Sequence, residues 1–194
     1  MRLKVLAPLL MIAAAACGKD ATTAADGTGT GPASSLKCKS SGKNAWDTFG
    51  VKAFVAVNES IFTEVGVVTK SSDATKAAEL GESFGHIGNK SVPALQDDVN
   101  TFKGKLAAFL VFVYGGPAKI TYTDKIEYVG NNQDMKTAHT GLAITSDQYD
   151  KFVGDVVVTA LTENGVTSDD IGSCFAPAIT GDTGAAFKAS IVGK

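Results

Sequence analysis

Side chains that titrate near neutral pH are scarce in this chain. Its 194 residues include two histidines, His86 and His139, which leave little for acid–base catalysis at neutral pH. The sequence contains no recognisable Ser/His/Asp motif, no phosphate-binding loop and no zinc-ligand spacing. These absences argue against the hydrolase, nucleotide-binding and zinc-protein classes.

An excess of basic charge is also absent. The chain carries 18 Lys and Arg residues against 20 Asp and Glu residues, a formal charge of −2. The charge becomes −4 once Arg2 and Lys4 are removed with the N-terminal segment described next. The sequence shows no basic patch, so nucleic acid is not an expected partner.

The N-terminus has the features of an export signal. Two basic residues precede an apolar run, Leu6 to Ala16, which is too short to span a membrane. The small residues before Cys17 resemble a bacterial lipobox, so we expect residues 1–16 to be a signal peptide and Cys17 to be lipidated. Ordinary cleavage after Ala16 is the alternative, because Ala14 stands where leucine is usual. The prediction is an exported protein, lipid-anchored to a bacterial membrane and facing the periplasm or the cell surface.

Composition divides the remaining chain into two parts. Residues 17–36 are rich in Gly, Ala, Thr and Ser without apolar periodicity, so we expect a flexible tether. Residues 37–194 have the size of one domain with one core. In an oxidising compartment Cys38 and Cys174 are a candidate disulfide, which would add about 4–5 kcal/mol on the chain-entropy model. A pair of buried free thiols is the alternative.

Hydrophobic periodicity predicts that the domain is mostly helical. The expected helices are 44–49, 51–65, 73–80, 92–114, 145–164 and 169–179. Ser91 is the expected cap of the fourth helix, Thr145 with Gln148 a capping box for the fifth, and Ser168 the cap of the last. Outside these helices we expect a Gly-rich loop over 81–89, an extended or irregular segment over 119–129, and little order after Thr180.

His139 is the most informative residue of the chain. In the segment DMKTAHTGL, helical spacing stacks Met135, His139 and Leu142 on one apolar side of a short helix. An imidazole held on such an inward face between two helices is suited to ligate iron from one face of a haem. A hydrogen-bonded core histidine is the alternative interpretation.

The run MKTAHTGLAITSDQYDKFVGDVVVTALTENGV resembles the proximal half of the truncated haemoglobins of group 1. That family has an M-K/R-x-x-H segment with the proximal histidine, then G-x-x-I-T, then a helix ending at G-V. The matching residues here are Met135, Lys136, His139, Gly141, Ile144, Thr145, Gly165 and Val166. Weaker matches lie at 46–64, at 102–117 and at 169–179, so the resemblance covers about two thirds of the chain.

The resemblance implies an all-α fold, a two-over-two helical sandwich with extra loops before and after the distal helix. It implies haem b as cofactor, with His139 as the proximal iron ligand; covalent attachment of the c type is excluded because there is no C-x-x-C-H motif. On the proximal side the expected haem contacts are Met135, Leu142, Tyr149 and Phe152. For each of these side chains, ordinary core packing is the alternative.

The distal side departs from the family pattern. The family commonly places a tyrosine on the second helix and a glutamine or other polar residue on the distal helix. Alignment puts Phe62 at the tyrosine position and Phe102 and Leu106 at the two distal-helix positions. None of these side chains can donate a hydrogen bond to a gas ligand, so oxygen should bind weakly, while CO and NO should be affected less. Other polar side chains remain as candidates for the pocket: His86, Tyr114 and Tyr122 as donors, and Lys103 and Lys105 as partners of the haem propionates.

The resemblance therefore implies a haem-binding globin that binds or senses a diatomic gas (oxygen, NO or CO) outside the cytoplasm, rather than an enzyme. A haem redox or NO-detoxifying protein, with an unidentified redox partner, is the second hypothesis. A haem-free globin-like interaction module is the third, because the distal polar residues are missing and extra loops are present.

Overall fold

The structure is a computed structural model, and it describes residues 22–23, 31–85, 91 and 96–194. The expected signal peptide, Cys17 and His86 lie outside the described residues. Most described residues lie in helices, as the sequence predicts, and the strands are short. In chain order the elements are β1 (Thr22–Thr23), α1 (Ala45–Thr69), α2 (Ala74–Ala78), α3 (Glu82–Gly85), α4 (Val99–Val113), β2 (Lys119–Thr121), β3 (Glu127–Val129), α5 (Met135–His139), α6 (Ser146–Lys151), the π-helix η2 (Phe152–Val157), α7 (Val158–Glu163), α8 (Ser168–Asp170), the π-helix η3 (Ile171–Phe175), the 3-10 helix η4 (Ala176–Ala178) and α9 (Asp182–Ala189).

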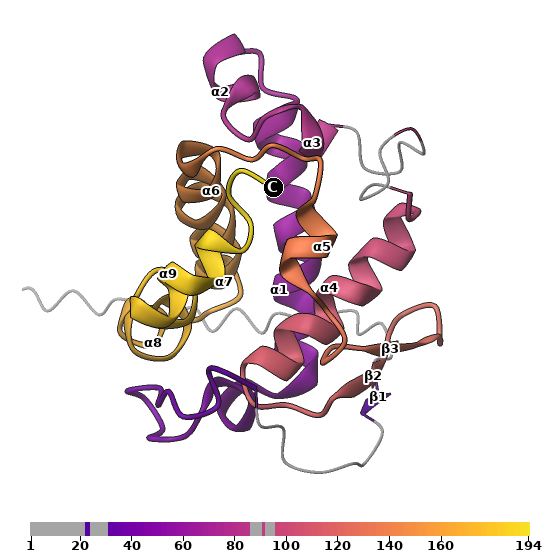
Figure 1. The fold of residues 1–194 in the computed structure, drawn as a ribbon. Coiled ribbons are helices and arrows are strands. Elements are labelled where there is room, and N and C mark those ends of the chain that lie inside the picture. The colour runs from indigo at the N-terminus through magenta and orange to yellow at the C-terminus, as the bar shows by residue number, and fades with distance from the viewer. Residues whose placement is uncertain (1–21, 24–30, 86–90, 92–95) are drawn as a thin grey trace, which may run out of the picture.

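The long helix α1 runs through the middle of the fold (Figure 1). It packs against α4 on one side and against η2 and α7 on another. The core between these helices is apolar and fully enclosed, with Val111, Val156 and Ala160 all without solvent exposure. Burial of such side chains is the main source of stability for a fold of this size.

A small antiparallel sheet stands beside α4, with the strands in the order β1-β2-β3. Ile120 pairs with Tyr128 across the hairpin formed by β2 and β3. Within α4, Gly104 leaves room for the ring of Tyr128, because a Cβ at this position would lie 2.3 Å from that ring. The segment 119–129, for which the sequence left extended and irregular structure open, is therefore a hairpin packed on α4.

Several helix boundaries agree with the sequence prediction because their capping residues are present. Asn44 accepts a hydrogen bond from Asp47 N at 2.7 Å and starts α1. The chain kinks at Gly50, whose φ of 70° favours glycine. The capping box of α6 forms as predicted, with Gln148 N donating to Thr145 Oγ1 at 3.2 Å and Thr145 N donating to Gln148 Oε1 at 2.8 Å.

The start of α4 differs from the prediction. The sequence placed the cap at Ser91, but residues 96–98 are not helical and α4 begins at Val99. Asp98 is the cap, and its carboxylate accepts hydrogen bonds from Asn100 N at 2.9 Å and Thr101 N at 3.0 Å. A carboxylate satisfies two of the free N–H groups at once, which explains why the helix starts here.

The last two predicted helices contain π-helical segments. The helix expected over 145–164 is continuous, but its middle is the π-helix η2. The helix expected over 169–179 is divided into α8, η3 and η4. Its cap is Thr167 rather than Ser168, because Thr167 Oγ1 accepts a hydrogen bond from Asp170 N at 3.2 Å. Side-chain periodicity fixes which face is buried, but it does not reveal a local change of hydrogen-bond register.

Part of the expected tether contacts the domain. Residues 31–36 were assigned to the flexible tether, yet Ala33 is 1% exposed and its N–H donates to Val113 O at 2.9 Å. Two further residues of that segment, Thr22 and Thr23, pair with β2. Backbone hydrogen bonds hold these residues on the domain although their side chains show no apolar pattern.

Two regions expected to lack structure contain helices. The predicted Gly-rich loop over 81–89 begins with the short helix α3, and the part from 86 to 89 lies outside the described residues. The tail after Thr180 forms α9, and Ile191 beyond it is 6% exposed. Across the described ranges, no helix is long and apolar enough to cross a membrane.

Candidate functional site

A large cavity lies between α1, α4, α5, the α6–η2 segment and α9. Its volume of about 1210 Å³ exceeds the range of ~300–1,000 Å³ that is usual for small-molecule pockets. Its wall is mainly apolar, and twelve aromatic side chains contribute to it: Phe49, Phe54, Phe62, Phe84, Phe102, Phe109, Phe112, Tyr114, Tyr149, Phe152, Phe175 and Phe187. Such a wall suits a large, mostly apolar ligand.

The side chains that the sequence assigned to a cofactor pocket all line this one cavity. They come from segments up to 90 residues apart, and they are Phe62, Phe102, Leu106, Met135, His139, Leu142, Tyr149 and Phe152. Helical periodicity predicted only that each of them faces inward. Their meeting at a single cavity is a result of the fold.

His139 is the last residue of α5, and the helix holds its ring in a defined state. Its Nδ1 lies 2.7 Å from Met135 O. Because a carbonyl oxygen can only accept, Nδ1 carries the proton in this contact, and a neutral ring then keeps its lone pair on Nε2. Burial lowers the pKa of His139 below the usual 6.5 and outweighs the opposing hydrogen bond to Met135. The site thus offers a neutral imidazole nitrogen as a ligand.

Leu142 reaches the cavity differently from the prediction. The sequence placed it on the helix of His139, but α5 ends at His139 and Leu142 lies in the following loop. Leu142 N donates to His139 O at 3.1 Å, and Ser83 Oγ donates to Leu142 O at 3.2 Å. The contact with α3 therefore helps to fix the loop that follows the histidine.

Phe62, Phe102 and Leu106, which align with the distal polar residues of the family, form part of the cavity wall from α1 and α4 and carry no hydrogen-bond donor. The rings of Phe62 and Phe102 meet edge to face, with centroids 5.6 Å apart. Leu106 follows Phe102 by one helical turn and lines the same wall. At these three positions the side chains that face the cavity are apolar.

The tyrosines considered as donors are engaged elsewhere. Tyr114 lines the cavity, but its hydroxyl donates to Phe175 O at 3.0 Å. Tyr122 is not part of the cavity wall, and its hydroxyl donates to Glu59 Oε1 at 2.5 Å. Tyr149 donates to Ile179 O at 2.8 Å, and burial raises its pKa to about 12. A hydroxyl proton committed to a backbone or carboxylate oxygen is not available to a ligand.

The two candidate lysines have different positions. Lys105 lines the cavity, and its Nζ pairs with Asp97 Oδ2 at 2.6 Å. Lys103 does not line it; its Nζ pairs with Glu59 Oε2 at 2.6 Å and lies 5.2 Å from the centroid of Phe62. Of the two, Lys105 is the one placed to meet an anionic group at the edge of the cavity.

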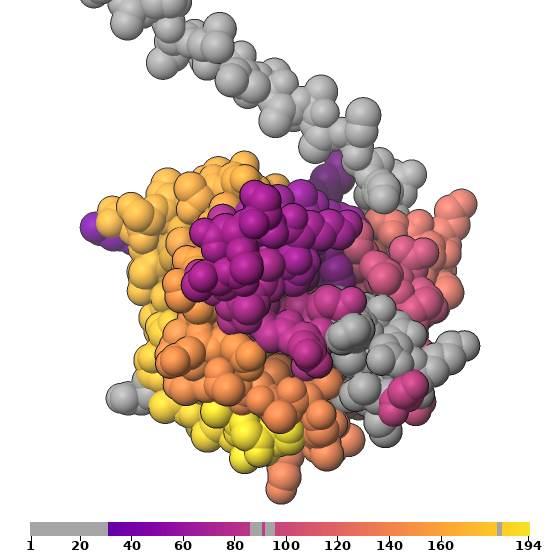
Figure 2. All heavy atoms as spheres, turned by 90° about the horizontal axis from the view of Figure 1, so that it is seen from above, coloured from indigo at the N-terminus to yellow at the C-terminus, as the bar shows by residue number. Residues whose placement is uncertain are grey.

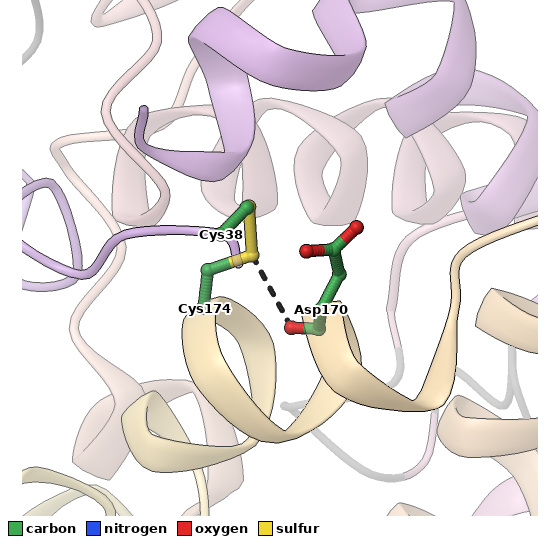
Figure 3. Close-up of side chains that lie close together, drawn as sticks. All are labelled: Cys38, Asp170 and Cys174. Atoms are coloured by element: carbon green, nitrogen blue, oxygen red, sulfur yellow. Dashed lines mark hydrogen bonds between the residues drawn. A yellow bond between two sulfur atoms is a disulfide. The ribbon is translucent and has the colours of Figure 1, made fainter. Parts of the chain in front are cut away.

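The two cysteines of the domain form a separate cluster with Asp170 (Figure 3). Cys38 and Cys174 are joined as a disulfide, with their Cα atoms 4.7 Å apart. A disulfide sulfur carries neither a proton nor a thiolate charge, so the 3.3 Å contact between Cys174 Sγ and Asp170 O is not a thiol hydrogen bond. Hydrogen bonds from Ser40 lower the pKa of the Asp170 carboxyl. The cluster is a structural crosslink rather than a metal site.

Sequence reasoning missed one wall of the cavity. Ala186, Phe187 and Ile191 line it from α9 and the residues after it, which were expected to have little order. The signal was present, because Phe187 and Ile191 are four residues apart and share one helical face. Phe84 was missed as well, and it stacks on Phe152 with the centroids 5.1 Å apart.

No model of a known family matches this chain. No curated protein matches it either.

Proposed function

We propose that this protein is a haem-binding globin-like protein of the truncated haemoglobin type, in which His139 ligates the iron. One observation carries the proposal above all. A neutral histidine, fixed through Nδ1 to a backbone carbonyl, lines a large aromatic cavity and has a lone pair left on Nε2. This pairing of one ring nitrogen with a carbonyl is how ligating histidines are usually oriented in metal sites.

The arrangement of the helices supports the same proposal. In a two-over-two sandwich, α1 and α4 would form one pair, and the segments α6–α7 and α8–η4 the other. The packing of α1 against both α4 and α7 is consistent with this assignment. The hairpin β2–β3 and the α2–α3 region would be the extra segments on either side of the distal helix.

The residues of the cavity fit a haem by their chemistry. Its aromatic and aliphatic walls suit the flat apolar ring. His139 would supply the nitrogen ligand, and Lys105, which lines the cavity, would pair with a haem propionate. When bound, the haem would supply an iron able to bind a diatomic gas. The chain itself would orient the ring, exclude water, and offer the gas an apolar wall of Phe62, Phe102 and Leu106.

The proposal is tested by the haem content of protein produced in haem-sufficient cells. The wild type should show a Soret band of stoichiometric intensity. His139→Ala should lose the haem or hold it weakly, because the cavity then lacks its nitrogen ligand. His86→Ala is the matched control, since it removes the other histidine of the chain, and it should keep the haem.

The outcomes separate the alternative functions. Full haem retention in His139→Ala would show that His139 is not the iron ligand. A wild type without haem would favour an interaction module or another apolar ligand. If the protein bound haem stoichiometrically, was reduced repeatedly by an electron donor and consumed NO, the redox function would be favoured over gas storage or sensing.

A further inference from the structure

Residues 181–194, here called the strap, form the side of the cavity that joins its two walls. The strap contains α9, and its Ala186, Phe187 and Ile191 line the cavity. Seen from above, the strap (yellow) lies directly against the orange segment that contains α5 and the following loop (Figure 2). The strap therefore lies against the loop that follows His139.

Aromatic and aliphatic contacts of the strap reach both walls. The ring of Phe187 stacks on Phe109 of α4, with centroids 5.9 Å apart, and meets Tyr149 of α6 at 6.5 Å. Ile191 belongs to a second, smaller core with Ile144 and Tyr149. Phe187 thus bridges the helix that carries Phe102 and the helix that follows His139.

Polar contacts of the strap hold the loop after His139. Ala143 N donates to Lys194 O at 3.0 Å, and Gly193 N donates to Ile144 O at 2.9 Å. Lys188 Nζ lies 2.6 and 2.7 Å from the two carboxylate oxygens of Asp150. These bonds connect the strap to the α5–α6 loop and to α6.

The strap also has features of a segment that can open locally. Its helix, α9, has eight residues and no side-chain cap at Gly181, and a helix of this length is unstable in water without packing. In chain order, α9 is the last helix of the described residues. Local opening of such peripheral units is less costly than global unfolding.

We propose that the strap controls how fast the ligand leaves the cavity and fixes the loop that follows His139. This inference deepens the proposed haem function and rests on it for the identity of the ligand. Opening the strap would separate Phe187 from Phe109 and Tyr149, release Ala143 and Ile144, and expose the cavity beside the histidine.

The first test measures haem transfer from the full-length protein to an excess of an apoglobin that scavenges haem. Phe187→Ala should accelerate the transfer about tenfold or more, because it removes the bridge between the walls. Lys188→Ala should accelerate it about two- to fivefold, as expected for a partly exposed ion pair. Lys52→Ala, on an exposed position of α1, is the matched control and should leave the rate unchanged. Equal rates in all four proteins would overturn the inference.

The second test does not depend on haem. Amide hydrogen exchange of the apoprotein should show Ala143 and Gly193 protected in the wild type, and both should lose protection in Phe187→Ala while α1 remains protected. A truncation after Thr180 should give the same loss at Ala143 and faster release of anilinonaphthalene sulfonate, an apolar fluorescent probe. If Ala143 kept its protection in both variants, the inference that the strap fixes the loop after His139 would be refuted. If the exchange changes occurred but the protein did not bind haem, only the haem function would be refuted.

Discussion

At the scale of single residues, the account depends on His139 and on what surrounds it. Its Nδ1 contact with Met135 O defines which ring nitrogen carries the proton in the neutral ring, and its burial lowers the pKa and so favours that neutral ring. On the α1–α4 wall, Phe62 and Phe102 contact each other and present no donor. The same cavity therefore combines an imidazole nitrogen with a free lone pair and an apolar face formed by Phe62 and Phe102.

Burial of His139 predicts a pH dependence of stability in the apoprotein. Because the pKa of the folded state is lowered below the unfolded value of about 6.5, the unfolded state binds the proton more readily. The free energy of unfolding should be highest above pH 6.5 and should fall as the pH drops from 6.5 toward the lowered pKa. Urea unfolding at pH 7.5 and pH 5.5 measures this. His139→Ala should reduce the loss of unfolding free energy between pH 7.5 and pH 5.5, whereas His86→Ala should keep the full loss. An equal loss in the wild type and His139→Ala would show that His139 does not cause the pH dependence.

The apolar wall predicts fast oxygen release from the ferrous protein. A donor near the gas ligand would contribute about 1.5–3 kcal/mol per charge-assisted hydrogen bond. Phe62→Tyr should therefore slow oxygen dissociation by about tenfold to more than a hundredfold. Phe62→Leu is the control, since it adds no donor and should not slow release. Stopped-flow dissociation checks both, and slow release in the wild type would show that another donor enters the pocket.

At the scale of elements, the sequence predicted the helices that have strong capping residues, but it did not predict the π-helical segments that interrupt two of the helices. Asp73 and Thr145 each cap the helix that the sequence assigned to them, and Asn44 caps α1 at the predicted start. Periodicity gave no sign of the π-helices η2 and η3, because the buried face continues through them. The start of α4 was misplaced because Ser91, Asp97 and Asp98 offer competing caps, and only the packing of α4 decides between them.

The capping box at the start of α6 should contribute measurably to stability. Thr145→Ala removes the acceptor for Gln148 N and should lower the free energy of unfolding by about 1 kcal/mol. Thr145→Ser keeps a hydroxyl and should stay within a few tenths of the wild type. Urea unfolding of the apoprotein measures both variants. Equal stability of Thr145→Ala and Thr145→Ser would mean that packing alone fixes the start of α6.

At the scale of the whole molecule, segments from Pro32 to Ile191 line one large cavity. The sequence predicted the residues of the two main walls from their inward periodicity and from the resemblance around His139. The third wall was missed, although Phe187 and Ile191 have helical spacing, because they lie in a Gly-rich segment whose helix packs against Tyr149 and Phe109. The disulfide Cys38–Cys174 joins the first described loop to η3, close to Phe175 at the cavity wall.

The central claim, that Nε2 of His139 is the iron ligand, is tested most directly by chemical rescue. His139→Gly removes the imidazole and leaves space beside the cavity. The absorption spectrum of the ferrous variant should lack the five-coordinate histidine form of the wild type, and added imidazole should restore that spectrum and stoichiometric haem binding. A His139→Gly protein that shows the wild-type spectrum without imidazole would contradict the account.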